Sequence, residues 1–330
     1  MGRVVCIDVP ATSANLGAGF DALALALDLA SRIDVEVVAV DREPTVMVEV
    51  EGEGSGHLPA GRHNRFVQAL YQGLAAGGLV EPAIGLRVRM ENRIPVSRGL
   101  GSSAAATVAA LVAADALLDG GLGEERILEL AAAAEGHPDN AAAAILGGLC
   151  VVAPVKGRPR AVRIEPPAAL LAALFIPDRP LSTAAMRAAL PKRVPFADAV
   201  HNVAAAATAV AAFSQDRLDL LRVATKDRLH EPYRAAAYPE LPAIIEAAVE
   251  AGALGACLSG AGSTVIAFSD QPEMAARVAE AMRQRAEQLG LPGRAAVHAA
   301  RAAGARIIGS TDATGGSADA PGSRSAPRLT

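Results

Sequence analysis

Polar side chains are concentrated in the segment Glu135-Gly136-His137-Pro138-Asp139-Asn140, which lies between two alanine-rich stretches. Carboxylate, imidazole and amide groups so close together can bind a cation, hold a polar substrate or orient a reacting group. Solvation of a surface loop does not account for this density, so we expect the segment to belong to a functional site. The alternative interpretation of His137 is a histidine that caps a helix.

A second candidate is the glycine-rich loop Pro95-Val96-Ser97-Arg98-Gly99-Leu100-Gly101-Ser102-Ser103-Ala104-Ala105. It lies between an expected strand and an expected helix, where unpaired backbone N–H groups and the helix dipole attract anions. Gly99 and Gly101 let the backbone close around phosphate oxygens, and Ser102 and Ser103 can cap the helix or bind phosphate or Mg²⁺. The loop matches neither the Walker A motif nor G-x-G-x-x-G. An ordinary glycine-rich turn with a serine N-cap is the alternative.

A third candidate is the loop that contains Asn15 and Asp21, which are separated by Gly17 and Gly19. The glycines permit tight curvature, so that an amide and a carboxylate can face one cavity. Asx-turn chemistry is the alternative for an Asn and an Asp in such a loop.

The elements that position these loops follow from hydrophobic periodicity and chain breakers. We expect strands over Val4–Val9, Ile33–Val40, Thr45–Glu51, Ile84–Glu91, 147–154, Leu170–Ile176, Ala256–Phe268 around a glycine turn, and Ala295–Ala300. We expect helices over Asn64–Ala76, Ser103–Leu118, Glu124–Ala134, from Pro138, and over Val200–Phe213 and Pro272–Leu289. The first strand then leads into the loop of Asn15 and Asp21, and the strand that ends at Glu91 leads into the glycine-rich loop.

Length and composition limit the class of protein. The 330 residues suggest two compact units, and a net charge of −4 disfavours nucleic-acid binding. The three cysteines lie far apart, so they are expected to be reduced and buried, and the charge-free stretch 141–155 is too short to span a bilayer. We therefore expect a cytoplasmic protein with no membrane partner. Ala is unusually abundant, and no feature of the sequence gives it a function.

The domain boundaries are expected at the proline-rich segment near residue 160 and where the composition changes near residue 310. Residues 1–160 would form an N-terminal domain and residues 161–309 a C-terminal domain. Residues 310–330 are rich in Ser, Gly, Ala, Pro and Arg, so they are expected to be a disordered tail.

Three segments together resemble the motifs of the GHMP kinase superfamily of small-molecule kinases. The loop PVSRGLGSSAAAT resembles the central phosphate-binding motif, and PATSANLGAGFDALALAL resembles the first motif in the form found in homoserine kinases. The segment Leu258–Val265 resembles the third motif, a glycine-rich turn that packs against the nucleotide-binding face. The order of the three motifs along the chain is that of the superfamily.

The resemblance implies an α+β fold of two domains with ATP and substrate in the cleft between them. The N-terminal domain would be like ribosomal protein S5 domain 2, and the C-terminal domain would be a ferredoxin-like α/β sandwich. It further implies phosphorylation of the side-chain hydroxyl of L-homoserine, a requirement for Mg²⁺, and a homodimer.

The resemblance also assigns site residues. Glu135, together with Ser103, would bind the metal, and Asn140 would orient the substrate hydroxyl instead of acting as a strong base. Arg187, in a segment like S-T-x-x-x-R…L-P, would bind the substrate carboxylate and thereby support catalysis. Further substrate contacts would come from Asn15, Asp21, His137, Asp139, Thr183 and Arg234, and ATP contacts from Pro95 through Ala105. Asn64 would contact the adenine, although its neighbours Arg65 and Phe66 depart from the family pattern, and the role of Arg98 stays open.

Two other functions are compatible with the motifs. One is a GHMP kinase that acts on a different alcohol, such as mevalonate or a sugar. The other is a nucleotide-binding regulatory protein that has lost catalysis, against which Glu135, Asp139 and Asn140 argue.

Overall fold

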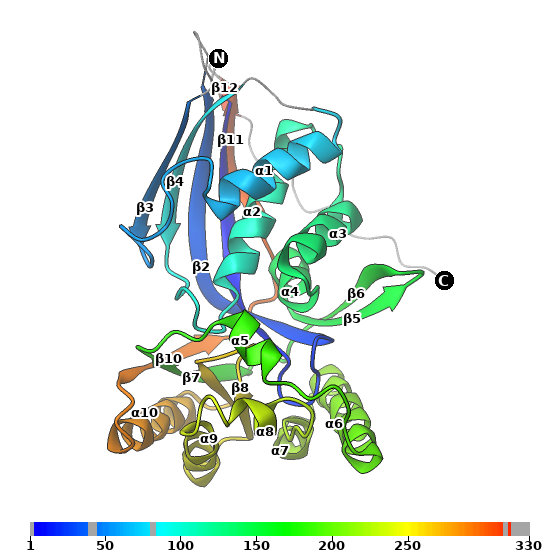
Figure 1. Ribbon diagram of the computed structural model, residues 1–330, viewed down its shortest axis with the longest axis vertical. Helices are drawn as coiled ribbons and strands as arrows, with labels where there is room; N and C mark the ends of the chain where they lie inside the picture. The colour runs from blue at the N-terminus through cyan, green and yellow to red at the C-terminus, as the bar shows by residue number, and fades with distance from the viewer. Residues whose placement is uncertain (1–2, 39–44, 80–83, 313–315, 318–330) are drawn as a thin grey trace.

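The computed structural model describes residues 3–38, 45–79, 84–312 and 316–317. The chain forms two layered units, one above the other in Figure 1. The strands of the upper sheet are β1 (Val4–Ala14), β2 (Leu23–Val38), β3 (Val46–Gly52), β4 (Gly85–Asn92), β5 (Leu149–Val155), β6 (Arg158–Ile164), β11 (Arg306–Asp312) and β12 (Gly316–Ser317). One face of this sheet is covered by α1 (Arg65–Ala76), α2 (Ser102–Leu117), α3 (Glu124–Glu135) and α4 (Asp139–Leu146).

Small side chains allow these helices to pack closely. Gly73 of α1 faces Ala114 of α2 so tightly that a Cβ on the glycine would lie 2.6 Å from that of the alanine. Ala141–Ala144 of α4 are completely buried, as are four alanines of α2. Many of the alanines, for which the sequence alone suggested no function, therefore serve the close packing of helices.

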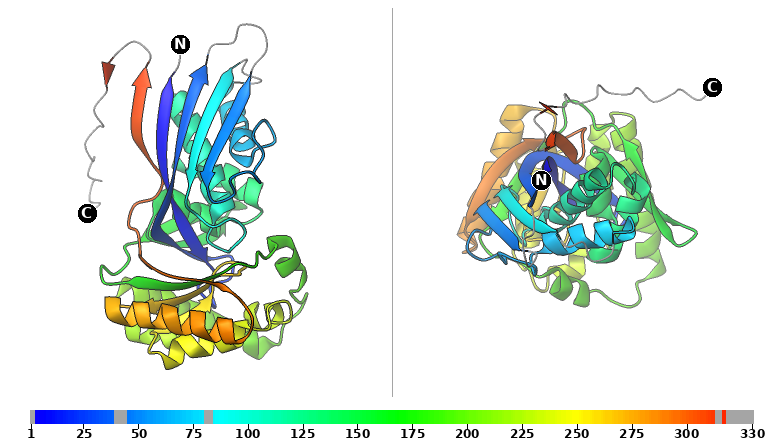
Figure 2. Two further views of the ribbon diagram at one scale, coloured as in Figure 1. Left: turned by 90° about the vertical axis from the view of Figure 1, so that its left-hand side faces the viewer. Right: turned by 90° about the horizontal axis from the view of Figure 1, so that it is seen from above.

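The lower unit has a four-stranded antiparallel sheet in the order β10-β7-β9-β8. Numbered within the unit, this order is 4-1-3-2, the ferredoxin-like arrangement expected for the C-terminal domain. Its strands are β7 (Leu171–Pro177), β8 (Gly255–Leu258), β9 (Val265–Ser269) and β10 (Gly293–Ala299). Its helices are α5 (Thr183–Ala188), α6 (Phe196–Ser214), η1 (Leu218–Leu220), α7 (Leu221–Ala224), α8 (Glu231–Arg234), α9 (Leu241–Glu250) and α10 (Pro272–Gln288). Figure 2 shows α10 lying along the outer face of this sheet.

The chain crosses between the two units at places that differ from the expected boundaries. β6 continues to Ile164 and pairs with β5, and β11 returns to the upper sheet, where it pairs with β1. The upper sheet thus includes residues 161–164 and 306–309, which were expected in the C-terminal domain. Residues 310–312 and 316–317 are in strands and not in a disordered tail, whereas 313–315 and 318–330 lie outside the described residues.

The strands that lead into the first loop are longer than their periodicity predicts. β1 continues through Pro10 to Ala14, and β2 begins at Leu23, well before the strand expected from Ile33. Because Ala11–Ala14 and Leu23–Leu27 are all buried, the alternation that marks a half-exposed strand is absent there. The loop of Asn15 and Asp21 is consequently held on two long paired strands.

One helix among the described residues, α6, is long and apolar enough to span a bilayer, with 28% of that window buried. It is part of the lower unit, where Asn202 donates to the carbonyl of Ala18 and to Asp227.

The three cysteines are all free. Cys150 and Cys257 are buried as expected, but Cys6 is only partly buried.

Candidate active site

The three motif segments lie side by side where the two units meet. Gly260 N–H donates to the carbonyl of Ala14 over 3.0 Å, and Thr264 N–H donates to that of Arg98 over 2.9 Å. A Cβ on Gly99, at φ +78°, would lie 2.1 Å from the carbonyl oxygen of Ser259. The third motif therefore supports the glycine-rich loop directly, and Gly99 permits their close approach.

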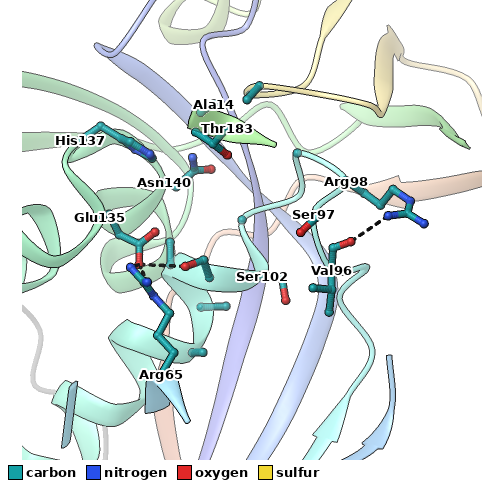
Figure 3. A pocket seen from close by; sticks show the side chains of 18 of the residues that line it. Ala14, Arg65, Val96, Ser97, Arg98, Ser102, Glu135, His137, Asn140 and Thr183 are labelled. Carbon is teal, nitrogen blue, oxygen red and sulfur yellow. Dashed lines mark hydrogen bonds and ion pairs between the residues drawn. The ribbon is translucent and has the colours of Figure 1, made fainter. Parts of the chain in front are cut away.

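These segments surround a cavity of about 390 Å³ (Figure 3). Most of the residues expected in the site line it, namely Asn15, Asp21, Asn64, Val96, Ser97, Arg98, Gly99, Gly101, Ser102, Ser103, Ala104, Ala105, Glu135, His137, Asp139, Asn140, Thr183, Arg187 and Arg234. Pro95 and Leu100 are buried and do not line it. The cavity thus joins residues from the first, middle and last thirds of the chain.

The glycine-rich loop delivers the start of α2 to the cavity. The N-cap of α2 is Gly101, in a left-handed conformation, and no side chain caps the helix, so the expected capping by Ser102 or Ser103 is wrong. Ser102 and Ser103 are already the first two residues of the helix. The N-cap position before them excludes a serine, since a Cβ on Gly101 would lie 2.0 Å from the hydroxyl oxygen of Thr12. An uncapped helix start that lines a cavity favours an anion.

The side chain of Arg98 is engaged in hydrogen bonds to the backbone. Its guanidinium donates to the backbone carbonyls of Val96, Pro177 and Asp178, at 3.0, 2.7 and 2.6 Å. The last two carbonyls belong to the end of β7 and the residue after it, so Arg98 links the loop to the lower unit. Figure 3 shows its guanidinium directed away from Ser102 and Glu135.

Glu135, at the end of α3, lies among hydroxyl and guanidinium groups. Its Oε1 accepts from Ser103 at 3.1 Å, from Thr107 at 2.8 Å and from Arg65 Nη2 at 2.7 Å. The carboxylate is only 7% exposed. A carboxylate next to a serine hydroxyl, beside an anion-binding helix start, is a donor set that suits Mg²⁺.

Asn140 is oriented by a residue that the sequence did not identify. Thr12 of β1, completely buried, donates from its hydroxyl to Asn140 Oδ1 over 2.8 Å. This contact fixes the amide oxygen and leaves the NH₂ group of Asn140 as a donor for the cavity. Thr12 lies within the first motif, but a buried strand threonine carries no signal of such a role in the sequence.

His137 and Asp139 form a pair at the cavity wall. His137 Nδ1 lies 2.9 Å from Asp139 Oδ1, and the same carboxylate oxygen accepts from the backbone N–H of Asn140. The hydrogen bond to Asp139 raises the pKa of His137, although burial opposes it. His137 therefore keeps its positive charge to a higher pH than an ordinary histidine.

Replacing Asp139 by Asn is expected to lower the pKa of His137, because the charged acceptor of its hydrogen bond is lost. In the wild type the imidazolium persists above the usual pKa of about 6.5, and in the variant it is lost at a lower pH. NMR titration of the His137 ring measures this, with His201, whose ring contacts the carbonyl of Lys226, as an internal control. An unchanged His137 titration would show that Asp139 does not stabilise the imidazolium.

Asp21 and Arg187 bind one another in the structure. The guanidinium of Arg187 donates to both oxygens of Asp21, at 2.5 and 3.0 Å, and stacks over the ring of Phe20. Each side chain is about one-third exposed. The groups expected to hold an ammonium and a carboxylate therefore bind each other in this structure.

Arg234 is 1% exposed, and its guanidinium donates to the carbonyl of Gly260 over 2.8 Å. Its Nη1 lies 3.2 Å from Nδ1 of His230, whose pKa burial lowers to about 4, so the ring is neutral and accepts. Among the described residues no carboxylate lies within 4.0 Å of this guanidinium, and its Nε has no hydrogen-bond partner. A buried cation that lines a cavity without a paired carboxylate can bind an anionic group there.

The remaining expected residues line the cavity but differ in how far their side chains are engaged in local hydrogen bonds. The amide of Asn15 donates to Gly260 and accepts from the backbone N–H of Asp21, so it shapes the loop. Asn64 caps α1, accepting from the N–H of Phe66 and donating to the carbonyl of Pro59. Thr183 begins α5, which is capped by Ser182. These three line the cavity, but two of them are also engaged in local structure.

Comparison with known proteins is consistent with this geometry. Residues 64–148 match the GHMP kinases N terminal domain, and residues 207–288 match the GHMP kinases C terminal domain. The chain is 42% identical to a homoserine kinase of Moorella thermoacetica over 84% of its own length and 93% of the relative's. It is 44% identical to a homoserine kinase of Thermus thermophilus over 81% and 87% of the two lengths.

The fold agrees with a solved relative. The crystal structure of homoserine kinase from Cytophaga hutchinsonii superposes with a TM-score of 0.81 and 27% identity, over 92% of this chain and 97% of that one. Both the sequence relationships and the arrangement of the two units thus point to the same group of enzymes. The chain belongs to the GHMP kinases and, among them, to the homoserine kinase family.

Proposed function

We propose that this chain transfers the γ-phosphoryl group of ATP to the side-chain hydroxyl of L-homoserine, giving O-phospho-L-homoserine and ADP for threonine biosynthesis. The observation that carries the proposal is one cavity with two chemically different ends. One end has the uncapped start of α2 beside Glu135 and Ser103. The other has the pair Asp21–Arg187 and the buried Arg234.

The second end complements an amino acid. Homoserine carries an ammonium and a carboxylate, so its binding replaces the Asp21–Arg187 pair by one contact of Asp21 to the ammonium and one of Arg187 to the carboxylate. Arg234 adds a second cation for the carboxylate. Thr183, Asn15, His137 and Asp139 surround the rest of the substrate, and mevalonate or a sugar would leave Asp21 without an ammonium partner.

At the first end the glycine-rich loop and the start of α2 bind the phosphates of ATP, and Asn64 lies at the adenine. Glu135 and Ser103 would hold Mg²⁺, which when bound neutralises the charge of the phosphates. The homoserine hydroxyl oxygen forms a bond to the γ-phosphorus, while the bond from that phosphorus to the β–γ bridging oxygen breaks. ADP leaves with the bridging oxygen, and the hydroxyl proton is released to the solvent. Asn140 orients the hydroxyl; because an amide is not a strong base, alignment and charge neutralisation carry the reaction.

Thr12→Val is expected to lower kcat about tenfold with little change in KM, because the hydroxyl that fixes the Asn140 amide is removed at nearly constant volume. Steady-state kinetics of phosphoryl transfer measure the effect, and thermal unfolding shows whether the variant is folded. Thr12→Ser keeps the donor and should restore kcat. If Thr12→Val had the wild-type kcat, the positioning role of Thr12 would be wrong.

A coupled assay of ADP release with L-homoserine, mevalonate, galactose and L-threonine tests the proposed function. We expect turnover with L-homoserine well above that with the other alcohols. Turnover with mevalonate or galactose alone would instead identify another kinase of the superfamily. Absence of phosphoryl transfer with all of them would point to a nucleotide-binding regulatory protein.

We place this activity in the cytoplasm, on a homodimer without nucleic-acid or membrane partners. A soluble amino-acid substrate and ATP are both available in that compartment. Light scattering after gel filtration measures the oligomeric state.

A further inference from the structure

Arg65, the first residue of α1, extends across the start of α2 to the end of α3. Its guanidinium donates from Nε and Nη2 to Glu135 Oε1, at 3.1 and 2.7 Å, and from Nη2 to the carbonyl of Ala134 at 3.0 Å. Its Nε also lies 3.2 Å from the hydroxyl oxygen of Thr107. Figure 3 shows Arg65 and Glu135 facing one another beside the helix start, and both line the cavity.

The other arginines that line the cavity are engaged elsewhere. Arg98 donates to three backbone carbonyls, Arg187 pairs with Asp21, and Arg234 is bonded to Gly260 and His230. Lysine is absent from the glycine-rich loop. In the described part of the cavity wall, Arg65 is therefore the guanidinium next to the start of α2, where a nucleotide's phosphates would lie.

Arg65 can change partners because its side chain is 46% exposed, in contrast to the 7% of Glu135. The carboxylate of Glu135 is fixed by the hydroxyls of Ser103 and Thr107, whereas the guanidinium reaches it from the solvent side. A metal ion and a guanidinium compete for one carboxylate, since each neutralises the same charge.

We propose that Arg65 is a nucleotide-binding residue that neutralises Glu135 in the free protein and donates to phosphate oxygens when a nucleotide binds, while Mg²⁺ competes with it for Glu135. The inference rests on the proposed function, because it places the phosphates at the start of α2. It has two consequences of opposite sign. Arg65 strengthens the binding of a nucleotide without metal, and it weakens the binding of the metal to Glu135.

The test uses the whole protein with Arg65→Met, which removes the charge, and Arg65→Lys, which retains it. Calorimetry measures the Kd of ADP in excess EDTA, and Mn²⁺ titration followed by electron paramagnetic resonance measures metal binding to the ADP complex. Arg126→Met is the matched control, because Arg126 is 50% exposed and also pairs with a glutamate of α3, Glu129, but does not line the cavity.

We expect Arg65→Met to raise the Kd of metal-free ADP about tenfold or more, the loss of one charge-assisted contact. Mn²⁺ should bind its ADP complex more tightly than it binds the wild-type complex. Arg65→Lys should lie close to the wild type in the first measurement, and Arg126→Met should match the wild type in both.

Two results would overturn the inference. One is an unchanged Kd of metal-free ADP in Arg65→Met; the other is a parallel weakening of metal-free ADP and Mn²⁺, as expected if Arg65 only supports the fold. The wild type separates this from the proposed function. If the wild type binds ADP and phosphorylates homoserine but Arg65→Met gives either of these two results, only the role of Arg65 is wrong. If the wild type neither binds ADP nor phosphorylates homoserine, both proposals are wrong.

Discussion

Replacing Glu135 by Gln is expected to lower kcat by a factor of about 10²–10³, while the KM for homoserine changes little. Gln keeps the size of the side chain and an oxygen that can accept from Ser103 and Thr107, so the local structure is retained. It loses the negative charge that would hold Mg²⁺ near the transferred phosphoryl group. Because this interaction acts on the developing charge of the transition state, its loss affects kcat more than substrate binding.

Steady-state kinetics over a series of Mg²⁺ concentrations measure this effect. Glu129→Gln is the control, because Glu129 lies on the same helix but pairs with Arg126 and Arg160 outside the main cavity. Wild-type kcat for Glu135→Gln at saturating Mg²⁺ would remove Glu135 from the metal site.

Replacing Arg187 by Ala is expected to raise the KM for homoserine by a factor of about 30–100, with a smaller change in kcat. The guanidinium is the bidentate partner of Asp21 in the structure and is proposed to bind the substrate carboxylate. Arg234 remains in the variant, so binding is weakened and not abolished. Ordinary substrate kinetics separate the two parameters.

Arg217→Ala is the control for Arg187→Ala, because Arg217 forms a comparable two-point ion pair with Asp219 outside the cavity. It should leave the KM for homoserine at the wild-type value. An Arg187→Ala enzyme with an unchanged homoserine KM would contradict the assignment of the carboxylate.

The strongly periodic elements were the most predictable from the sequence. The helix expected over Asn64–Ala76 is α1, with Phe66, Val67, Leu70 and Leu74 on its buried side. β11 was not predicted, because its pairing with β1 joins residues about 300 positions apart and depends on the whole N-terminal sheet. The start of β2 was missed since a strand buried on both faces has no alternation.

For the site, residue types predicted membership of the cavity better than they predicted contacts. The pairing of Asp21 with Arg187 joins residues 166 positions apart, so the residue types alone did not predict it. Ser102 and Ser103 were expected to cap α2, but Thr12 fills the space beside Gly101 and the helix begins without a side-chain cap. Thr12 and Arg65 lie far in the sequence from Asn140 and Glu135, so no local pattern could reveal those contacts.

The product expected of this chain is a phosphate ester on the side-chain oxygen of homoserine. Phosphorus NMR of a reaction containing the protein, ATP, Mg²⁺ and L-homoserine tests it most directly, because the product's phosphorus couples to the adjacent CH₂ protons. We expect a new phosphomonoester signal, split by two protons, that grows in step with ADP. A reaction in which ATP yields only inorganic phosphate and ADP, or in which ATP is not consumed, would contradict it.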